Sequence, residues 1–192
     1  MIRIFDTVFS LLGLIILSPI LLSLFIIGFF DTGSPLFRQE RVGVNKRPFY
    51  LLKFRSMHVN TQAMATDLVQ VSAITKWGSF LRKSKLDELP QLFNVLAGDM
   101  SFVGPRPNLF NQIELIEERG KRGVYSIRPG ITGLAQIQKI DMSTPQLLAE
   151  TDAKMIKKLS VINYFFYIFK TLLGRGFGDR VSKSKLISKN AQ

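Results

Sequence analysis

A long uncharged stretch near the N-terminus constrains the fold of this chain more than any other feature of its sequence. Residues 8–30 form a run of 23 residues without a charged side chain. As a helix this run would be about 35 Å long, enough to cross a hydrocarbon core of about 30 Å. A signal peptide fits poorly, because only Arg3 and Asp6 precede the run as charges and no small-residue cleavage site follows it. The run therefore predicts a helix that enters a membrane.

Ser18 and Pro19 lie at the centre of this run. Pro19 cannot donate a backbone hydrogen bond, and its ring crowds the carbonyl four residues earlier, so the helix is expected to kink there. These residues alone favour a kinked span and a re-entrant hairpin equally. Basic residues follow the run at Arg38, Arg41, Lys46 and Arg47. Because basic flanks stay on the cytoplasmic side, both alternatives place the body of the protein in the cytoplasm.

The composition narrows the chemistry of the chain. The formal net charge is +12, with 26 Lys and Arg against 14 Asp and Glu. This balance indicates an anionic partner, which can be nucleic acid, an anionic lipid or a phosphorylated substrate. The chain has no cysteine, which excludes disulfides, thiolate zinc sites and a cysteine nucleophile, and its one histidine, His58, has no second histidine with which to form a His-rich metal site. Transfer chemistry therefore has to rest on carboxylates, hydroxyls, lysines or arginines.

The first half of the remaining chain predicts two strands and a helix. Alternating segments at residues 35–39 and 48–55 predict the strands. The polar residues 60–71 predict a loop. Residues 76–97 predict a helix in which Ser84 is a candidate N-cap with Asp87 three residues on, and Pro90 either disturbs this helix or opens a new one.

The second half predicts three more helices. One extends from about residue 107 to residue 119, and a second begins with Thr144 as N-cap and Pro145 as its first residue. Residues 159–173 are too few for a membrane span and predict either a core helix or an interfacial helix on the bilayer. The basic tail after residue 174 suits an anionic membrane surface or a solvated tail.

Asp87 and Glu88 are the strongest candidates for chemistry. They follow the basic stretch 82–85, and nearby cations favour the ionised form of a carboxyl group. An ionised aspartate can attack phosphorus and form a covalent phosphoryl intermediate. Adjacent helical side chains point about 100° apart, so the second carboxylate can hold a divalent cation. The competing interpretation is structural, with one acid capping a helix and the other solvated.

Several basic residues are candidates for binding phosphate. Arg106 lies between two prolines, and Arg128 precedes Pro129. A residue before proline is biased to extended backbone, so each guanidinium can act as a prepositioned phosphate clamp, and a surface turn explains each arginine equally well. Lys53 and Arg55 would share one face of a strand, as part of a solvated sheet face or of a phosphate site.

Four motifs together resemble one known family. They are FRQERVG at residues 37–43, KFRSM at residues 53–57, LDELPQLFNVLAGDMSFVGPRP at residues 86–107 and RPGITGLAQ at residues 128–136. The pattern resembles the bacterial sugar transferases, the monotopic phosphoglycosyl transferases that begin O-antigen, capsule and glycoprotein glycan assembly. The resemblance extends from about residue 3 to residue 173, and the chain is similar to the short form of the family.

The resemblance implies an α/β fold with a membrane hairpin. Residues 1–32 would form a re-entrant helix-break-helix broken at Ser18 and Pro19, residues 33–174 a small catalytic α/β domain with interfacial amphipathic helices, and residues 175–192 a basic tail. The enzyme would lie in the bacterial inner membrane among its lipids, with the catalytic domain on the cytoplasmic face. A homodimer is compatible with the sequence but is not required by it.

The resemblance also implies a ping-pong mechanism. Asp87 matches the nucleophile that takes a sugar 1-phosphate from a UDP-sugar and releases UMP, after which undecaprenyl phosphate takes the sugar phosphate. Glu88, together with Asp87, matches the site of the cofactor Mg²⁺. The family's basic positions that bind the substrate phosphates match Lys53, Arg82 and Arg106. Arg128 is a further candidate because it directly precedes Pro129.

The chain departs from the family pattern at three places: Lys85, IQKI at residues 137–140 and KMIK at residues 154–157. These departures affect the expected identity of the sugar more than the type of reaction. The segment GFGDRV at residues 176–181 resembles members that handle N-acetylated sugars, so the expected sugar is an N-acetylated hexosamine.

Two other functions compete with this reading. One is a transferase of the same type with another nucleotide donor. The other is a non-catalytic, membrane-anchored basic module that binds anionic lipid or nucleic acid. The sequence argues against this module, and so against nucleic acid as a partner, because its basic residues are spread through apolar motifs rather than clustered with stacking aromatics on one face.

Overall fold

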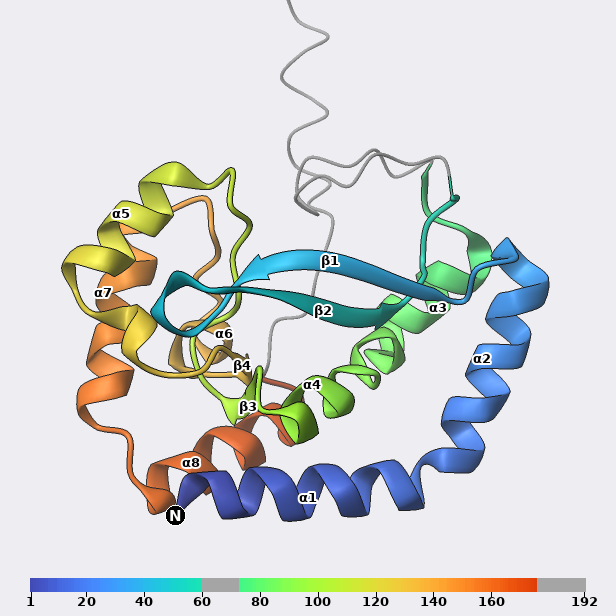
Figure 1. Ribbon diagram of the computed structural model, residues 1–192, viewed down its shortest axis with the longest axis horizontal. Helices are drawn as coiled ribbons and strands as arrows, with labels where there is room; N and C mark the ends of the chain where they lie inside the picture. Colours follow the sequence, from blue (N-terminus) through green and yellow to red (C-terminus); the bar gives the residue numbers. More distant parts are fainter. Residues whose placement is uncertain (60–72, 176–192) are drawn as a thin grey trace, which may run out of the picture.

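The computed structural model describes residues 1–59 and 73–175. Two helices, α1 (Ile2–Ile16) and α2 (Ser18–Thr32), form the N-terminal region. They meet at a 64° bend, and Figure 1 shows α1 along the lower edge of the molecule with α2 rising from its end. In the described part of the chain, no single helix is both long and apolar enough to cross a membrane, whereas α1 and α2 meet that criterion as a bent pair.

The bend lies where the sequence predicts it. Leu17 separates the two helices, and Pro19 occupies the first turn of α2. The missing N–H of proline is harmless there, because first-turn N–H groups have no acceptor within the helix. The hydroxyl of Ser18 donates a hydrogen bond to the carbonyl of Ile15 over 2.8 Å. The predicted kink at Ser18 and Pro19 is confirmed.

The two predicted strands form an antiparallel hairpin of β1 (Leu36–Val42) and β2 (Pro48–Phe54), joined by the 3₁₀ turn η1 (Val44–Lys46). Their register places Phe37 opposite Lys53, so these two side chains share one face. The hairpin packs on a core cluster formed by Phe49, Leu51, Val95 and Met100.

The predicted helix over residues 76–97 is divided into three elements: α3 (Lys76–Ser84), the 3₁₀ turn η4 (Leu86–Glu88) and α4 (Gln91–Ala97). The N-cap of α3 is Thr75, whose hydroxyl oxygen accepts a backbone hydrogen bond of 2.8 Å. The prediction of Ser84 as an N-cap is wrong, because Lys85 adopts a left-handed conformation with φ 59° and ends α3 there. Pro90 is the N-cap of α4, so it opens a new helix.

The second half of the chain contributes a second pair of strands and several helical elements. Its strands β3 (Ser101–Val103) and β4 (Gly130–Thr132) pair in parallel. Its helical elements are α5 (Ile113–Lys121), η5 (Val124–Ser126), α6 (Leu134–Ile137), α7 (Pro145–Lys157), α8 (Val161–Lys170) and the π-helical η6 (Thr171–Arg175). The described residues contain two two-stranded sheets and many helices, so the predicted α/β class is confirmed in its coarse form.

The predicted start of α7 is confirmed, whereas α5 begins later than predicted. α5 begins at Ile113 rather than near residue 107, because the carbonyl of Asn108 accepts a 3.0 Å hydrogen bond from the end of β1 and keeps the preceding segment extended. α7 begins at Pro145 as predicted, although the side chain of Thr144 makes no capping hydrogen bond.

α8 has one face in the core and one face exposed. Tyr164 and Tyr167 are buried, whereas Phe166 and Phe169 are exposed. Figure 1 shows α8 beside α1, and the ring of Phe165 lies 5.2 Å from that of Phe5 on α1. The predicted loop at residues 60–71 and the basic tail from residue 176 onward lie outside the described residues.

A buried carboxylate attaches α1 to the rest of the molecule. Asp6 is 1% exposed. One of its oxygens accepts hydrogen bonds from the hydroxyls of Ser101 and Tyr164, each at 2.9 Å, and from the backbone N–H of Phe102 at 3.1 Å. The first helix is therefore fixed to both β3 and α8.

Both ends of the helix pair contact the same body. Near the start of α1, the guanidinium of Arg3 donates to the carbonyl of Leu96 at the end of α4 over 2.8 Å. Near the end of α2, Asp31 accepts a 2.8 Å hydrogen bond from the hydroxyl of Thr75, the N-cap of α3. The helix pair is thus attached to the body near both of its ends.

Candidate active site

Asp87 and Glu88 lie together on η4, the single 3₁₀ turn between α3 and α4. Asp87 is 4% exposed and the side chain of Glu88 is 12% exposed. The turn is held by Leu86 and Leu89, which pack on an apolar cluster of Leu24, Phe54 and Leu81. Successive side chains on a 3₁₀ turn point about 120° apart, so the two carboxylates start from different directions on the same turn.

Two cations converge on the carboxylate of Glu88. The ammonium nitrogen of Lys53, from β2, lies 3.6 Å from its Oε1, and the Nη2 of Arg106, from the segment after β3, donates to the same oxygen over 3.3 Å. The Lys53 side chain is only 10% exposed, and a buried ammonium needs such a partner. The structure therefore brings three predicted residues together from three separate parts of the chain.

Arg82 presents a donor group close to the end of β2. Its Nε donates a 2.9 Å hydrogen bond to the hydroxyl of Ser56. Its Nη1 is buried and makes no hydrogen bond within the part of the chain that the structure describes. A buried N–H of this kind is costly unless an acceptor arrives, and a phosphate oxygen is a suitable one.

Two other basic residues point away from Glu88. The Nε of Arg128 donates a 2.7 Å hydrogen bond to the carbonyl of Gly98, at the opposite end of α4 from η4. Arg55 donates to the carbonyl of Ser34 over 2.8 Å, and its guanidinium lies over the ring of Phe37. In the described residues neither guanidinium is placed against the acidic pair.

The acidic pair offers hard oxygen ligands. Among residues 1–59 and 73–175, no group of three or more His, Cys, Asp or Glu side chains is placed to hold a metal ion. Mg²⁺ is usually held by one or two carboxylates, with substrate phosphates and water completing its shell. Asp87 and Glu88 fit that mode of binding, in which the substrate supplies part of the coordination.

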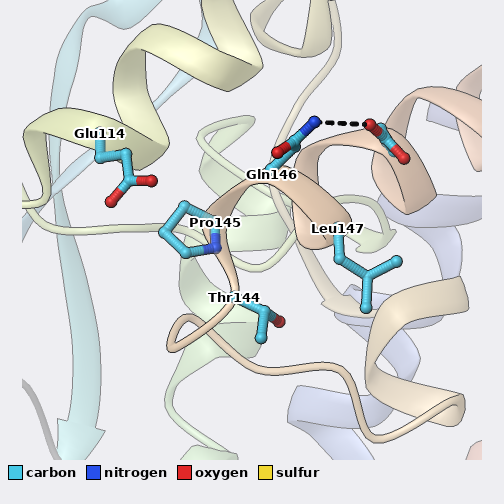
Figure 2. A pocket seen from close by; sticks show the side chains of 6 residues that line it. Glu114, Thr144, Pro145, Gln146 and Leu147 are labelled. Atoms are coloured by element: carbon cyan, nitrogen blue, oxygen red, sulfur yellow. Dashed lines mark hydrogen bonds between the residues drawn. The ribbon is translucent and has the colours of Figure 1, made fainter.

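A surface depression lies elsewhere on the molecule, as Figure 2 shows. It is lined by Glu114 of α5 and by the first turn of α7, where Gln146 donates to Glu150 over 3.4 Å. It contains neither Asp87 nor Glu88, and its two acids would repel a phosphorylated substrate.

Sequence reasoning missed the buried polar groups that support this site. Arg119 and Asp152 form a fully buried ion pair, and Asp6 has three hydrogen-bond donors. The one available signal was an acid, Asp6, placed directly before a long uncharged run. Nothing in the local sequence indicates that Arg119 and Asp152 meet.

Comparisons with known proteins agree with the motif pattern. A family model described as bacterial sugar transferase matches residues 1–175. The chain is 40% identical over 151 residues to the UDP-glucose:undecaprenyl-phosphate glucose-1-phosphate transferase of Xanthomonas campestris pv. campestris, covering 74% of this chain and 31% of that protein. It is 35% identical over 189 residues to the exopolysaccharide production protein ExoY of Sinorhizobium fredii, covering 88% and 83%.

A third relative has a different sugar in its name. The chain is 33% identical over 185 residues to the UDP-N-acetylgalactosamine-undecaprenyl-phosphate N-acetylgalactosaminephosphotransferase of Aeromonas hydrophila, covering 91% of this chain and 44% of that protein. The chain thus spans less than half the length of the Xanthomonas and Aeromonas proteins. Since the family model matches residues 1–175 of the 192 in the chain, the chain belongs to the bacterial sugar transferase family.

Proposed function

We propose that this chain transfers a sugar 1-phosphate from a UDP-sugar to undecaprenyl phosphate and releases UMP. The observation that carries the proposal is the buried Asp87–Glu88 pair with Lys53 and Arg106 on Glu88. A carboxylate nucleophile beside prepositioned cations suits displacement at a diphosphate, where negative charge has to be stabilised. The names of the Xanthomonas and Aeromonas relatives describe the same class of reaction.

The proposed reaction proceeds in two displacements at one phosphorus atom. A carboxylate oxygen of Asp87 attacks the phosphorus that carries the sugar, the P–O bond to UMP breaks, and UMP leaves with the bonding electrons. An oxygen of undecaprenyl phosphate then attacks the same phosphorus and displaces Asp87 as a free carboxylate. The products are UMP and an undecaprenyl diphosphate sugar, so every bond broken is matched by one formed.

The remaining residues bind and orient the substrates. Lys53, Arg82 and Arg106 supply N–H donors for the phosphate oxygens, and Glu88 holds Lys53 and Arg106 in place. Asp87 and Glu88 would hold Mg²⁺, which when bound neutralises charge on the phosphates. Arg128 donates a hydrogen bond to the carbonyl of Gly98 and is given no step in the proposed reaction.

The helix pair supports a re-entrant membrane hairpin. Asp6 at one end and Asp31 at the other both bond the same body, which a straight span cannot satisfy. Between these ends the exposed side chains are apolar apart from Ser18 and Ser23, and they include Leu12, Ile16 and Phe25. With the basic residues that follow the helices, this arrangement supports a catalytic domain on the cytoplasmic face of the bacterial inner membrane.

The sugar itself is left open by the relatives. The Xanthomonas relative has glucose in its name, and the Aeromonas relative has N-acetylgalactosamine. The glucose name does not match the expected N-acetylated hexosamine. The segment on which that expectation rested, residues 176–181, lies outside the described residues. UDP-glucose, UDP-galactose and UDP-N-acetylhexosamines all belong in the test, and a homodimer remains a separate prediction.

The test is UMP release by purified protein in detergent with Mg²⁺, undecaprenyl phosphate and each UDP-sugar. Release that depends on the lipid acceptor, and that is lost in Asp87→Asn, supports the proposal and identifies the sugar. Release of another nucleoside monophosphate from a different donor would correct the donor class. If folded protein releases no nucleotide from any donor, the proposed function is wrong.

A further inference from the structure

A buried ion pair lies behind the segment that carries Arg106. Arg119 on α5 and Asp152 on α7 have side chains that are 1% and 0% exposed. The Nε and Nη2 of Arg119 donate to one carboxylate oxygen of Asp152 over 3.0 and 2.7 Å. Burial raises the pKa of the Asp152 carboxyl, and Arg119 opposes that rise. Charges removed from water this completely require good mutual geometry.

The third nitrogen of the same guanidinium reaches the active-site segment. The Nη1 of Arg119 donates to the backbone carbonyl of Arg106 over 2.8 Å and to the side-chain oxygen of Asn108 over 2.9 Å. The hydroxyl of Tyr125 donates to that Asn108 oxygen as well, over 3.0 Å. One side chain therefore connects α7 to the peptide group of Arg106.

That peptide group has little other freedom. Pro105 and Pro107 fix their own φ angles on either side of Arg106. The carbonyl of Pro107 accepts a 3.1 Å hydrogen bond from Arg41. The Arg106 carbonyl accepts its hydrogen bond from Arg119, which fixes the orientation of the peptide group between Arg106 and Pro107.

We propose that Arg119, held by Asp152, is a positioning residue that sets the Arg106 guanidinium against Glu88 and the substrate phosphates. The inference rests on the proposed function, because Arg119 touches no substrate and acts through Arg106. A guanidinium suits this role because its planar fork bonds Asp152, the carbonyl and Asn108 at once. A lysine ammonium keeps the charge but cannot span all three acceptors from one fixed position.

The chain offers a matched control for this substitution. Arg122, also at the end of α5, bonds Glu150 of α7 over 3.1 Å. This second pair joins the same two helices but lies near the surface, with side chains that are 24% and 39% exposed. Among the described residues Arg122 makes no hydrogen bond or ion pair with the segment around Arg106. Arg122→Lys therefore reports what an arginine-to-lysine change between α5 and α7 does by itself.

The experiment measures kcat/KM for UMP release in Arg119→Lys, Arg122→Lys, Arg106→Ala and the double variant Arg106→Ala/Arg119→Lys. Arg119→Lys is expected to lower kcat/KM on the order of tenfold, since a small displacement of the Arg106 guanidinium weakens its contact with the substrate phosphates. Arg122→Lys should stay within about twofold of the wild type. In the Arg106→Ala background, Arg119→Lys should lower kcat/KM by less than about twofold, because the effects of two residues that act as a unit are not additive.

Equal losses from Arg119→Lys in both backgrounds, or a wild-type rate in Arg119→Lys, would overturn the proposal. A second readout is independent of activity: hydrogen exchange of peptides covering residues 104–112. Exchange there should be faster in Arg119→Lys than in Arg122→Lys, and equal exchange would also overturn the proposal. A wild-type protein that releases no nucleotide contradicts the proposed function instead, and the exchange measurement then decides the positioning role alone.

Discussion

The ammonium nitrogen of Lys53, on β2, lies 3.6 Å from a carboxylate oxygen of Glu88, on η4. This contact joins the hairpin to the 3₁₀ turn that carries Asp87. Both side chains are nearly buried, at 10% and 12% exposure, so water screens the pair less than it would on the surface. The same ammonium is therefore well placed to stabilise phosphate charge in the proposed reaction.

Replacing Lys53 with methionine tests that role. Lys53→Met keeps most of the side-chain volume and removes the charge, so kcat for UMP release should fall on the order of a hundredfold. Arg47→Met, at an exposed position in the hairpin turn, removes the same charge from the chain and should stay near the wild-type rate. Similar losses in both variants would show that net charge matters rather than the position of Lys53.

Glu88→Gln tests the proposed binding of Mg²⁺. The substitution keeps the shape of the side chain but removes an oxygen ligand and its charge. The Mg²⁺ concentration that gives half of the maximal rate should rise about tenfold or more. Glu40→Gln on the exposed face of β1 is the control and should leave the Mg²⁺ dependence unchanged. An unaltered Mg²⁺ dependence in Glu88→Gln would remove Glu88 from the metal site.

Tyr164→Phe tests the attachment of α1. Burial, with Asp6 beside it, holds the pKa of Tyr164 above its usual value, so its hydroxyl remains a donor to Asp6. Its removal should lower the free energy of unfolding by about 1–3 kcal/mol, because a buried acceptor loses one of its partners. Tyr167→Phe is the control, since the Tyr167 hydroxyl has no hydrogen bond among the described residues and its loss should cost less than about 0.5 kcal/mol. Thermal unfolding in detergent compares the two, and equal shifts would refute this role for Asp6.

The close approach of β3 and β4 gives a steric prediction. A Cβ atom on Gly130 would lie 2.0 Å from the backbone nitrogen of Gly104, a contact that only a backbone shift can relieve. Gly130→Ala should therefore yield little folded protein. In Gly120→Ala the added Cβ meets only the flexible end of Lys46, and alanine favours the helix by about 1 kcal/mol. Size-exclusion profiles of the two variants decide the matter, and a normal Gly130→Ala profile would contradict the packing of these strands.

Local patterns predicted the elements whose causes are local. Alternation identified both strands of the hairpin, and the chemistry of proline identified the break at Pro19 and the start of α7 at Pro145. The failure at Ser84 has a physical reason as well. Lys85 adopts a left-handed conformation that a lysine rarely takes, and no side-chain pattern indicates it.

The supporting groups of the site could not be predicted in this way. The Asp6–Tyr164 contact joins residues 158 positions apart, and the Arg119–Asp152 pair joins two helices through charges that usually lie on the surface. The motif pattern did place Lys53, Arg106 and Glu88 in one site, and the structure joins them. The domain limits at residues 33 and 174 and the role of the tail stay predictions.

The most direct test of Asp87 as the nucleophile is the intact mass of the protein after incubation with a UDP-sugar and Mg²⁺ in the absence of lipid acceptor. We predict that the wild type gains the mass of one sugar phosphate and loses it again when undecaprenyl phosphate is added, and that Asp87→Asn gains no mass. A wild-type protein that releases UMP in the presence of lipid, yet never gains this mass with the same donor, would contradict Asp87 as the nucleophile.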